Sequence, residues 1–280
     1  MTAEEGGGGD GAARQTPDLL YDLDNGVGWI TLNRPDAHNA ITPDQRNALI
    51  ALLERCSDDV EVRCVVLTAT GKGFCTGADL RAGRDPRAPQ RERTMGDVAR
   101  VIRTGAQRLI AAVMDCEKPV IAAVNGTAAG LGAHLAFASD LVIAADSARF
   151  IEVFVRRGIA ADAGGAYLLP RIVGLQKAKE LIFFGDDVSA ADAERLGLVN
   201  KVVPLAELAA AAREWAERLA SGPTKALAMD KWLLNRSLDS DRRTAFDEEA
   251  WAQELVSATD DSQEGLRAFA ERRATEFKGR

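Results

Sequence analysis

Residues 120–132 read VIAAVNGTAAGLG and decide the fold class. The continuous apolar run Val120–Val124 is typical of a β-strand that is buried on both faces. The glycines Gly126, Gly130 and Gly132 are typical of the turn that carries such a strand into a helix, because glycine accepts positive φ angles and close backbone approach. This stretch therefore predicts one strand-to-helix unit of an α/β protein.

Further apolar runs rich in β-branched residues extend this pattern in both directions. We predict strands in three of them: Gly28–Leu32, Cys64–Thr68 and Leu141–Ala144. Helical signals lie between them. Thr42 followed by Pro43 and Gln45 is typical of a capped helix start, and a helical apolar face runs from Val98 to Val113. Alternation of strands and helices predicts a layered α/β fold with parallel pairing.

From about Pro204 the strand pattern stops and helical patterns follow. We expect three or four helices, at Leu205–Ala220, Pro223–Ser237, Arg242–Ser257 and Asp261–Phe277. The chain then divides into a disordered glycine-rich tail (1–16), an α/β core (17–203) and a helical region (204–280). The helical region is expected to pack either on its own core or on a neighbouring subunit.

The composition excludes several classes of function. The 280 residues hold 35 basic and 42 acidic side chains, a net charge of −7, which argues against a general binder of nucleic acid or of membrane surfaces. No apolar run approaches the roughly 20 residues that span a bilayer, and the N-terminus has no signal-peptide pattern, so we expect a cytoplasmic protein. The four cysteines form no CxxC pair and there are two histidines, so no metal site is expected.

Three glycine-rich segments are candidates for ligand binding, since each is expected to join a strand to a helix. They are residues 71–80, 125–132 and 158–165. The free N–H groups at the start of a helix bind anions and oxyanions, although glycine turns are also ordinary parts of α/β proteins. None of the three fits the dinucleotide-binding or P-loop pattern, which disfavours those sites.

Short motifs along the chain, in their order and spacing, resemble the crotonase, or enoyl-CoA hydratase/isomerase, superfamily from about Val27 to the C-terminus. The motifs are Leu32-Asn33-Arg34-Pro35 with Asn39-Ala40, Gly73-Phe74 with Gly77-Ala78-Asp79-Leu80, Lys118-Pro119-Val120 with Asn125-Gly126, Gly164-Gly165 with Leu169-Pro170-Arg171, Ser189-Ala190 with Ala193 and Gly197-Leu198-Val199, and Glu264-Gly265 with Ala268-Phe269.

The resemblance implies a spiral of ββα units whose C-terminal helices assemble a homotrimer or a dimer of trimers. It implies an acyl-CoA thioester as substrate, with coenzyme A present as part of that substrate and no permanently bound cofactor. By position, the backbone N–H groups of Ala78 and Leu131 would hold the thioester oxygen as it gains enolate charge. A backbone donor of this kind typically contributes about 3 kcal/mol to lowering the barrier.

The remaining substrate contacts also follow from the resemblance. Gly130 and Phe154 would lie against the substrate, and Phe269 and Lys278 would reach the CoA of a neighbouring subunit. The arginines suit phosphate binding in an acidic protein, but each of them also fits a solvated surface charge. The expected CoA contacts are Arg34, Ala37, His38, Thr76, Asp79, Leu80 and Arg81, with Arg84 as a further phosphate partner. The family often has lysine at Asp36 and an apolar residue at His38, which puts the phosphate contacts there in doubt.

The residue that moves protons is the main open question. Hydratases of this superfamily use two glutamates, and the matching positions here are His134 and Phe154, which argues against efficient hydration. Asp162 matches the catalytic aspartate of certain isomerases of the superfamily. A double-bond shift needs only one such base, and burial would raise its pKa. Asp162 also fits an N-cap, which would lower its pKa.

His134 is the second ambiguous residue: it either contacts the substrate or is a polar helix residue satisfied by a neighbour. If its segment is extended, Glu152 would point to the opposite side, so it is not among the candidates, and Cys75 is expected to be buried and inert. We expect the segment Arg84–Arg93 to be mobile and close to the acyl group. The sequence favours an enoyl-CoA isomerase; the alternatives are an enoyl-CoA hydratase using Asp162 and His134, or a non-catalytic acyl-CoA binder.

Overall fold

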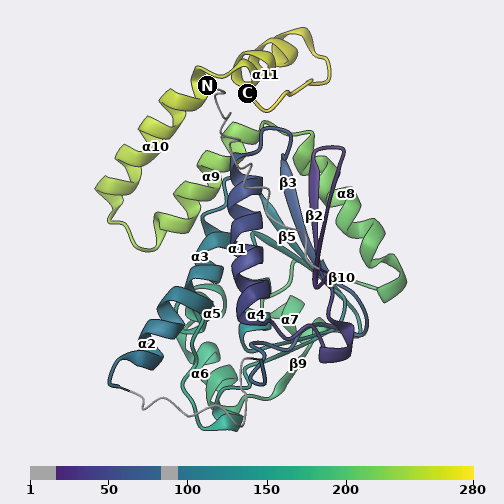
Figure 1. Cartoon of the computed structure of the whole chain (residues 1–280). Coiled ribbons are helices and arrows are strands. Elements are labelled where there is room, and N and C mark those ends of the chain that lie inside the picture. The colour runs from purple at the N-terminus through teal and green to yellow at the C-terminus, as the bar shows by residue number, and fades with distance from the viewer. Residues whose placement is uncertain (1–16, 83–93) are drawn as a thin grey trace, which may run out of the picture.

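The structure is a computed structural model that describes residues 17–82 and 94–280. The predictions for the tail 1–16, for Arg84 and for the segment Arg84–Arg93 lie outside the described residues. The described residues form two β-sheets covered by helices, with a group of helices extending from one end (Figure 1).

The larger sheet has six strands in the order β1-β2-β3-β5-β7-β10. β1 pairs antiparallel with β2, and the other neighbours are parallel. The four predicted strand runs all lie in this sheet, which confirms them. The strands are β1 (Leu19–Asp24), β2 (Val27–Leu32), β3 (Cys64–Ala69), β5 (Val120–Val124), β7 (Leu141–Ala145) and β10 (Lys201–Val203).

The smaller sheet has the order β4-β6-β8-β9. Its members are β4 (Gly73–Cys75), β6 (Thr127–Ala129), β8 (Arg149–Ile151) and β9 (Asp187–Ser189). The pairs β3/β4, β5/β6 and β7/β8 are consecutive in the chain, and each gives one strand to each sheet before a helix follows. Repetition of this strand–strand–helix unit winds the chain into a spiral.

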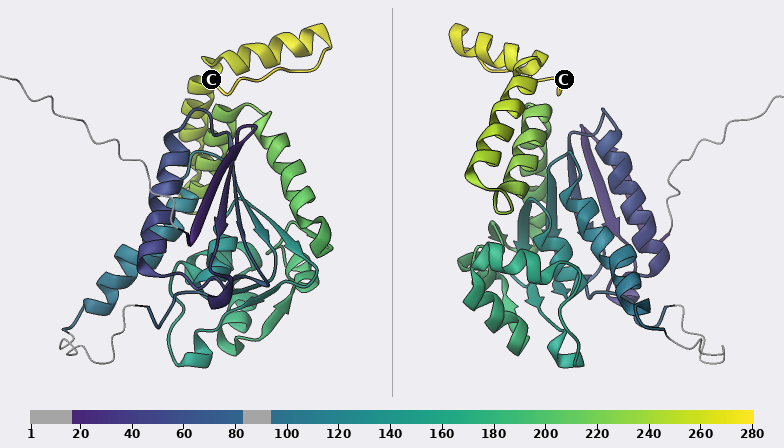
Figure 2. Two further views of the ribbon diagram at one scale, coloured as in Figure 1. Left: turned by 45° about the vertical axis from the view of Figure 1, so that its right-hand side comes forward. Right: turned by 90° about the vertical axis from the view of Figure 1, so that its left-hand side faces the viewer.

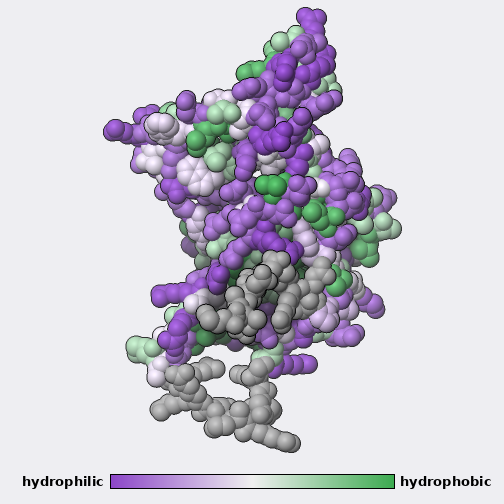
Figure 3. Space-filling model, turned by 45° about the horizontal axis from the view of Figure 1, so that its top comes forward, coloured by the Kyte–Doolittle hydropathy of each residue, from purple (hydrophilic) through white to green (hydrophobic). Residues whose placement is uncertain are grey.

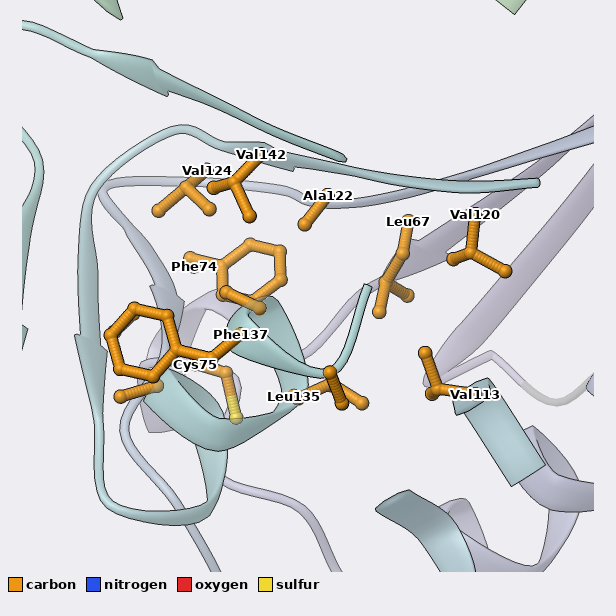
Figure 4. Packing of buried hydrophobic residues seen from close by; sticks show 14 of the residues in the cluster. Leu67, Phe74, Cys75, Val113, Val120, Ala122, Val124, Leu135, Phe137 and Val142 are labelled. Atoms are coloured by element: carbon orange, nitrogen blue, oxygen red, sulfur yellow. The ribbon is translucent and has the colours of Figure 1, made fainter. Parts of the chain in front are cut away.

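Helices cover the spiral and complete its main hydrophobic core. Thr42 caps the first of them through a bond from the Gln45 N–H to its hydroxyl oxygen (3.1 Å), which confirms the predicted start. Figure 4 shows the core around α4, where Phe74 and Leu135 pack with strand residues such as Val124 and Val142. The helices are α1 (Pro43–Asp58), α2 (Asp97–Ile102), the π-helical η2 (Arg103–Gln107), α3 (Arg108–Met114), α4 (Leu131–Phe137), α5 (Gly165–Val173), α6 (Leu175–Phe184) and α7 (Ala190–Arg195), with short 3-10 turns η1 (Pro35–Ala37) and η3 (Val155–Arg157).

The helical region begins with the 3-10 turn η4 (Leu205–Glu207) and α8 (Leu208–Ala220). Ala212 and Ala216 of α8 are fully buried in a second core cluster with strand residues such as Val66 and Ile143. This helix therefore packs on its own core. The next helices are α9 (Thr224–Ser237), α10 (Arg242–Ser257) and α11 (Asp260–Glu271), and α10 and α11 stand away from the sheets (Figures 1 and 2).

The final helix is shorter than predicted. It ends at Glu271 instead of continuing to Phe277, because Arg272 adopts a left-handed conformation (φ 54°) and stops the helical hydrogen bonding. The chain then turns back along α11. The Asp261 carboxylate accepts bonds from the N–H groups of Lys278 (2.6 Å) and Gly279 (2.7 Å), which fixes the C-terminal residues.

Large apolar side chains remain exposed on the helical region, and Figure 3 shows hydrophobic side chains interspersed with hydrophilic ones in the upper part of the molecule. Phe269 is 86% exposed and Trp251 is 70% exposed. Other exposed apolar residues of these helices include Trp232, Leu234, Phe246, Leu255 and Leu266. No helix in residues 17–82 or 94–280 is long and apolar enough to cross a membrane.

Candidate active site

The first predicted amide donor, Ala78, lies in the loop after β4. Ile41 forms an isolated parallel bridge with it: the Ile41 N–H donates to Gly77 O (2.8 Å), and the Asp79 N–H donates to Ile41 O (2.9 Å). These two bonds flank Ala78 and leave its own N–H outside the bridge. As far as residue 82, no helix begins in or after segment 71–80, in contrast to the expectation, because β4 and this bridge take up the backbone there.

The second predicted donor, Leu131, is the first residue of α4, which confirms the predicted helix start. A first-turn N–H has no acceptor within its own helix. Gly130 donates its N–H to Ile151 O (2.9 Å), which ties the start of α4 to the end of β8. Within the described part of the chain, neither Ala78 nor Leu131 donates its N–H to a turn or loop acceptor.

Two glycines bring these two amides into adjoining loops. A Cβ atom on Gly132 would lie 2.1 Å from the carbonyl oxygen of Cys75, so only glycine lets α4 approach β4 this closely. A Cβ atom on Gly77 would lie 3.7 Å from the amide nitrogen of Leu131. The loop that carries Ala78 is therefore packed directly against the start of α4.

Arg34 and Asp79, two predicted CoA contacts, bind each other beside this loop. The Arg34 guanidinium donates to Asp79 Oδ2 (3.0 Å) and to Ala40 O (2.5 Å). Asp79 also accepts from the Arg81 N–H (3.0 Å), and this bond, together with Arg34, holds the pKa of the Asp79 carboxyl below its usual range. Arg34 thus braces the donor loop, and a contact between its remaining N–H groups and a phosphate stays a prediction.

Other predicted CoA contacts surround the same loop. The carbonyl oxygen of His38 accepts from the Thr76 N–H (3.2 Å), and the side chains of His38 and Leu80 are exposed. Ala37 closes the short turn η1 before His38, and Arg81 is exposed next to Leu80. By contrast, Phe269 and Lys278 lie in and after α11, at the far end of the molecule from α4 (Figure 1).

His134, in the first turn of α4, forms a buried pair with Glu152, which follows β8. Nε2 of His134 lies 3.0 and 3.1 Å from the two carboxylate oxygens of Glu152, and the Phe154 ring stacks on the imidazole with 5.3 Å between centroids. The expectation that Glu152 points away is wrong, because β8 ends at Ile151 and the strand alternation ends with it. The sequence signal that could have predicted this buried pair is the position of Glu152 within the apolar stretch 150–155.

Asp162 precedes α5 without capping it. The helix begins at Gly165, its N-cap is Gly164, and no side chain caps it, so the capping alternative is wrong. Asp162 is half-buried, and burial raises the pKa of its carboxyl above the ordinary value, while nearby His134 acts in the opposite direction. The structure therefore brings a carboxyl of raised pKa close to the His134–Glu152 pair.

Cys75 lies under the donor loop and is fully buried. Burial raises the pKa of its thiol to about 12, which keeps it protonated and inert, as expected. Among the residues described, no three His, Cys, Asp or Glu side chains gather in a way that could hold a metal ion. The acid–base groups of this region are thus Asp162, His134 and Glu152.

A spiral of strand–strand–helix units with a helical C-terminal region defines the crotonase fold. Comparison with known proteins agrees: residues 22–280 match the enoyl-CoA hydratase/isomerase family. The chain belongs to this family and is an enzyme of the enoyl-CoA hydratase/isomerase class.

Three relatives illustrate the match. The chain is 36% identical to a 1,2-epoxyphenylacetyl-CoA isomerase of Escherichia coli, with 94% of this chain and 98% of the relative covered. It is 35% identical to a short-chain-enoyl-CoA hydratase of Clostridium acetobutylicum, with the same coverage of 94% and 98%. A crystal structure of an enoyl-CoA hydratase/isomerase from Cupriavidus metallidurans has a TM-score of 0.86 at 38% identity, and covers 95% of this chain and 98% of that one.

Proposed function

We propose that the protein is an enoyl-CoA isomerase that moves a double bond from C3 to C2 of an acyl thioester. Asp162, as a carboxylate, takes a proton from C2, and the electron pair of that C–H bond enters a dienolate. The same carboxyl then returns the proton to C4, which leaves the double bond between C2 and C3. Atoms and charge balance with one base and no other reactant.

The observation that carries this proposal is that the carboxyl group of Asp162 is half-buried and free of a capping role. Its carboxyl caps no helix, and burial raises its pKa. A base whose pKa is raised towards neutrality can both accept and return a proton, whereas a carboxyl of ordinary pKa returns it poorly. Asp162 is therefore suited to a proton shuttle.

The amides of Ala78 and Leu131 would stabilise the dienolate oxygen. Both belong to loops held together by the close contact between Gly132 and Cys75. Fixed backbone donors need no reorganisation when charge develops, and removing one such donor typically costs about 3 kcal/mol of barrier stabilisation. Coenzyme A would enter only as part of the substrate, along the rim formed by His38, Leu80 and Arg81.

We also propose that α10 and α11 assemble a homotrimer or a dimer of trimers. The exposed aromatic residues Phe269 and Trp251 support this, because large exposed apolar side chains mark interaction surfaces. In such an assembly, Phe269 and Lys278 would contact the CoA of a neighbouring subunit.

Hydration of a 2-enoyl thioester is the second candidate function. The names of the relatives more often say hydratase than isomerase, and the His134–Glu152 pair supplies a second acid–base group beside Asp162. In this case His134 would take a proton from water as its oxygen bonds to C3, and Asp162 would deliver a proton to C2.

The test supplies 3-enoyl-CoA and 2-enoyl-CoA separately to the purified protein, and to Asp162→Asn. Isomer formation that falls at least a hundredfold in Asp162→Asn, but not in the exposed control Asp186→Asn, supports the isomerase. Conversion of 2-enoyl-CoA to 3-hydroxyacyl-CoA as the faster reaction favours the hydratase. Acyl-CoA binding without turnover of either substrate would make the protein a non-catalytic binder and overturn both proposals.

A further inference from the structure

The hydrogen bonding of the His134–Glu152 pair fixes which imidazole nitrogen carries the hydrogen. Both carboxylate oxygens of Glu152 lie within 3.1 Å of Nε2. One N–H shared between two carboxylate oxygens accounts for these two nearly equal distances, so we assign Nε2 as the donor in this pair. Nδ1 then carries a lone pair in the neutral ring and an N–H in the charged ring.

The imidazole of His134 is also held in one orientation. Phe154 stacks on it with an angle of 14° between the ring planes. On another side, a Cβ atom at Gly165 would lie 2.3 Å from Cε1 and 2.4 Å from Nε2, so the ring occupies the space that any larger residue at 165 would need. Glu152 binds the ring, Phe154 stacks on it and Gly165 lies close to it, and these three neighbours support the observed orientation.

Nδ1 of this fixed ring has no hydrogen-bond partner among the described residues. His134 is completely buried, and an unsatisfied polar atom in such a place is costly unless a ligand binds it. Its position suits a ligand: His134 lies one helical turn after Leu131 on α4, and it is close enough to Asp162 to influence its pKa. His134 therefore belongs to the same region as the proposed reacting groups.

We propose that Glu152 is a positioning residue that holds His134 so that Nδ1 binds a hydroxyl group on the acyl chain of the substrate. A hydroxyl both donates and accepts hydrogen bonds, so it satisfies Nδ1 in the neutral and in the charged ring. A hydrocarbon chain satisfies neither. The inference rests on the proposed function only in needing an acyl thioester in this site; it does not depend on the route of the proton.

Binding calorimetry on the full-length protein tests this preference with butyryl-CoA, 3-hydroxybutyryl-CoA and 4-hydroxybutyryl-CoA. We expect one of the hydroxylated ligands to bind about tenfold more tightly than butyryl-CoA, since one hydrogen bond to a buried polar group is gained. Equal affinities for all three would overturn the hydroxyl site while leaving the proposed function standing. Failure of all three to bind would overturn the proposed function itself, and this inference with it.

Two substitutions of His134 distinguish the roles of its two ring nitrogens. Gln in place of His134 puts an amide near the Nε2 position and keeps a partner for Glu152, whereas Asn puts an amide near the Nδ1 position. We expect His134→Gln to lose the preference for the hydroxylated ligand and His134→Asn to keep part of it. The opposite order would show that Nδ1 is not the contact.

Glu152→Gln preserves the shape of the side chain and removes its charge. We expect this variant to bind butyryl-CoA as the wild type does but to retain at most a third of the preference for the hydroxylated ligand. The control is Glu207→Gln in the exposed turn η4, which should leave the preference unchanged. An unchanged preference in Glu152→Gln would overturn the positioning role.

Nitrogen-15 NMR of the imidazoles gives a reading that does not depend on any variant folding. The chain has only two histidines, and His38 is exposed, so the signals of buried His134 can be told apart. We expect free wild type to show Nε2 protonated, and Nδ1 to shift on binding the preferred hydroxylated ligand but not butyryl-CoA. An Nδ1 signal that responds equally to both ligands would contradict the inference.

Discussion

The ammonium group of the buried residue Lys231 lies 2.8 Å from the carboxylate of Asp140, whose side chain is 22% exposed, and this contact fastens α9 to the chain just before β7. Lys231 also donates to the carbonyl oxygens of Val113 (3.1 Å) and Lys118 (3.3 Å), while Asp140 accepts from the Val120 N–H (2.7 Å). One side chain of the helical region thus completes the hydrogen bonding of three segments of the core.

Lys231→Met should therefore destabilise the protein strongly. Lys231 is buried and the Asp140 side chain is 22% exposed, so removing the lysine leaves a partly desolvated carboxylate without compensation, at a cost of about 2 kcal/mol, which is less than for a fully buried pair. The matched control is Lys225→Met, because Lys225 lies on the same helix as Lys231, α9, and makes an exposed ion pair with Glu117 (3.6 Å). An exposed pair of this kind contributes about 1 kcal/mol or less to stability. Denaturant unfolding of both variants measures the difference; similar losses would contradict the role of Lys231.

The pH dependence of catalysis should report Asp162. Because the base must be ionised, kcat/KM should rise with pH through the pKa of Asp162, which burial raises above the ordinary value of about 4. This limb should be absent from the residual activity of Asp162→Asn. A limb at or below pH 4 in the wild type would contradict the raised pKa.

Asp162 should also destabilise the folded protein at neutral pH. Its pKa is higher in the folded than in the unfolded chain, so the unfolded state ionises first and stability falls as the pH rises through the folded pKa. We expect Asp162→Asn to melt at the same or a higher temperature than the wild type at pH 7, although its activity is lost. A clear drop in melting temperature would indicate a structural role instead.

Gly132→Ala should disable the amide pair. The new Cβ atom would lie 2.1 Å from Cys75 O, a backbone atom that cannot move without shifting β4 and the loop with Ala78. We expect a loss of at least a hundredfold in kcat/KM or failure to fold. Gly197→Ala is the control, since its Cβ atom meets nothing within 4 Å and only its positive φ (78°) is strained, at a cost of about 1 kcal/mol. Equal effects of the two changes would argue against the close contact.

The C-terminal residues should loosen in acid. Arg273 pairs with Glu264 and lowers the pKa of that carboxyl to about 2. Because the folded pKa is depressed, this contribution is fully present above the unfolded value of about 4.3 and is lost as the pH falls towards 2. Hydrogen exchange of residues 272–280 should therefore quicken in Glu264→Gln at pH 6 but not in Glu276→Gln, whose exposed side chain makes no ion pair among the described residues. Equal exchange in both variants would contradict this anchor.

Phe269→Ala tests the proposed intersubunit site. Sedimentation of the wild type should give a trimer or a dimer of trimers, and the variant should keep that state while binding CoA thioesters several-fold more weakly. The exposed residue Leu205, in η4, provides Leu205→Ala as a control. A monomer in sedimentation would remove the role given to Phe269 and Lys278.

Local sequence signals determined four strands of the larger sheet and the helical region, but they did not predict the short strands of the smaller sheet. Continuous apolar runs such as Val120–Val124 form the buried parallel strands, since only strands covered on both faces tolerate such runs. Thr42 with Pro43 and Gln45 starts α1, because a helix start is governed by the few residues that satisfy its first N–H groups. Where the signal was weaker, as at the end of α11, the conformation of one residue, Arg272, decided the outcome.

The sequence by itself determined the central strands β2, β3, β5 and β7, the helical C-terminal region, the family and the candidate residues Ala78, Leu131 and Asp162, since these depend on short segments and their spacing. Only the tertiary structure decided that Glu152 turns inward to His134 and that Asp162 caps no helix. The physical reason is that burial and pairing of charges depend on groups far apart in the chain, and the spiral brings them together only when both sheets and α4 are in place.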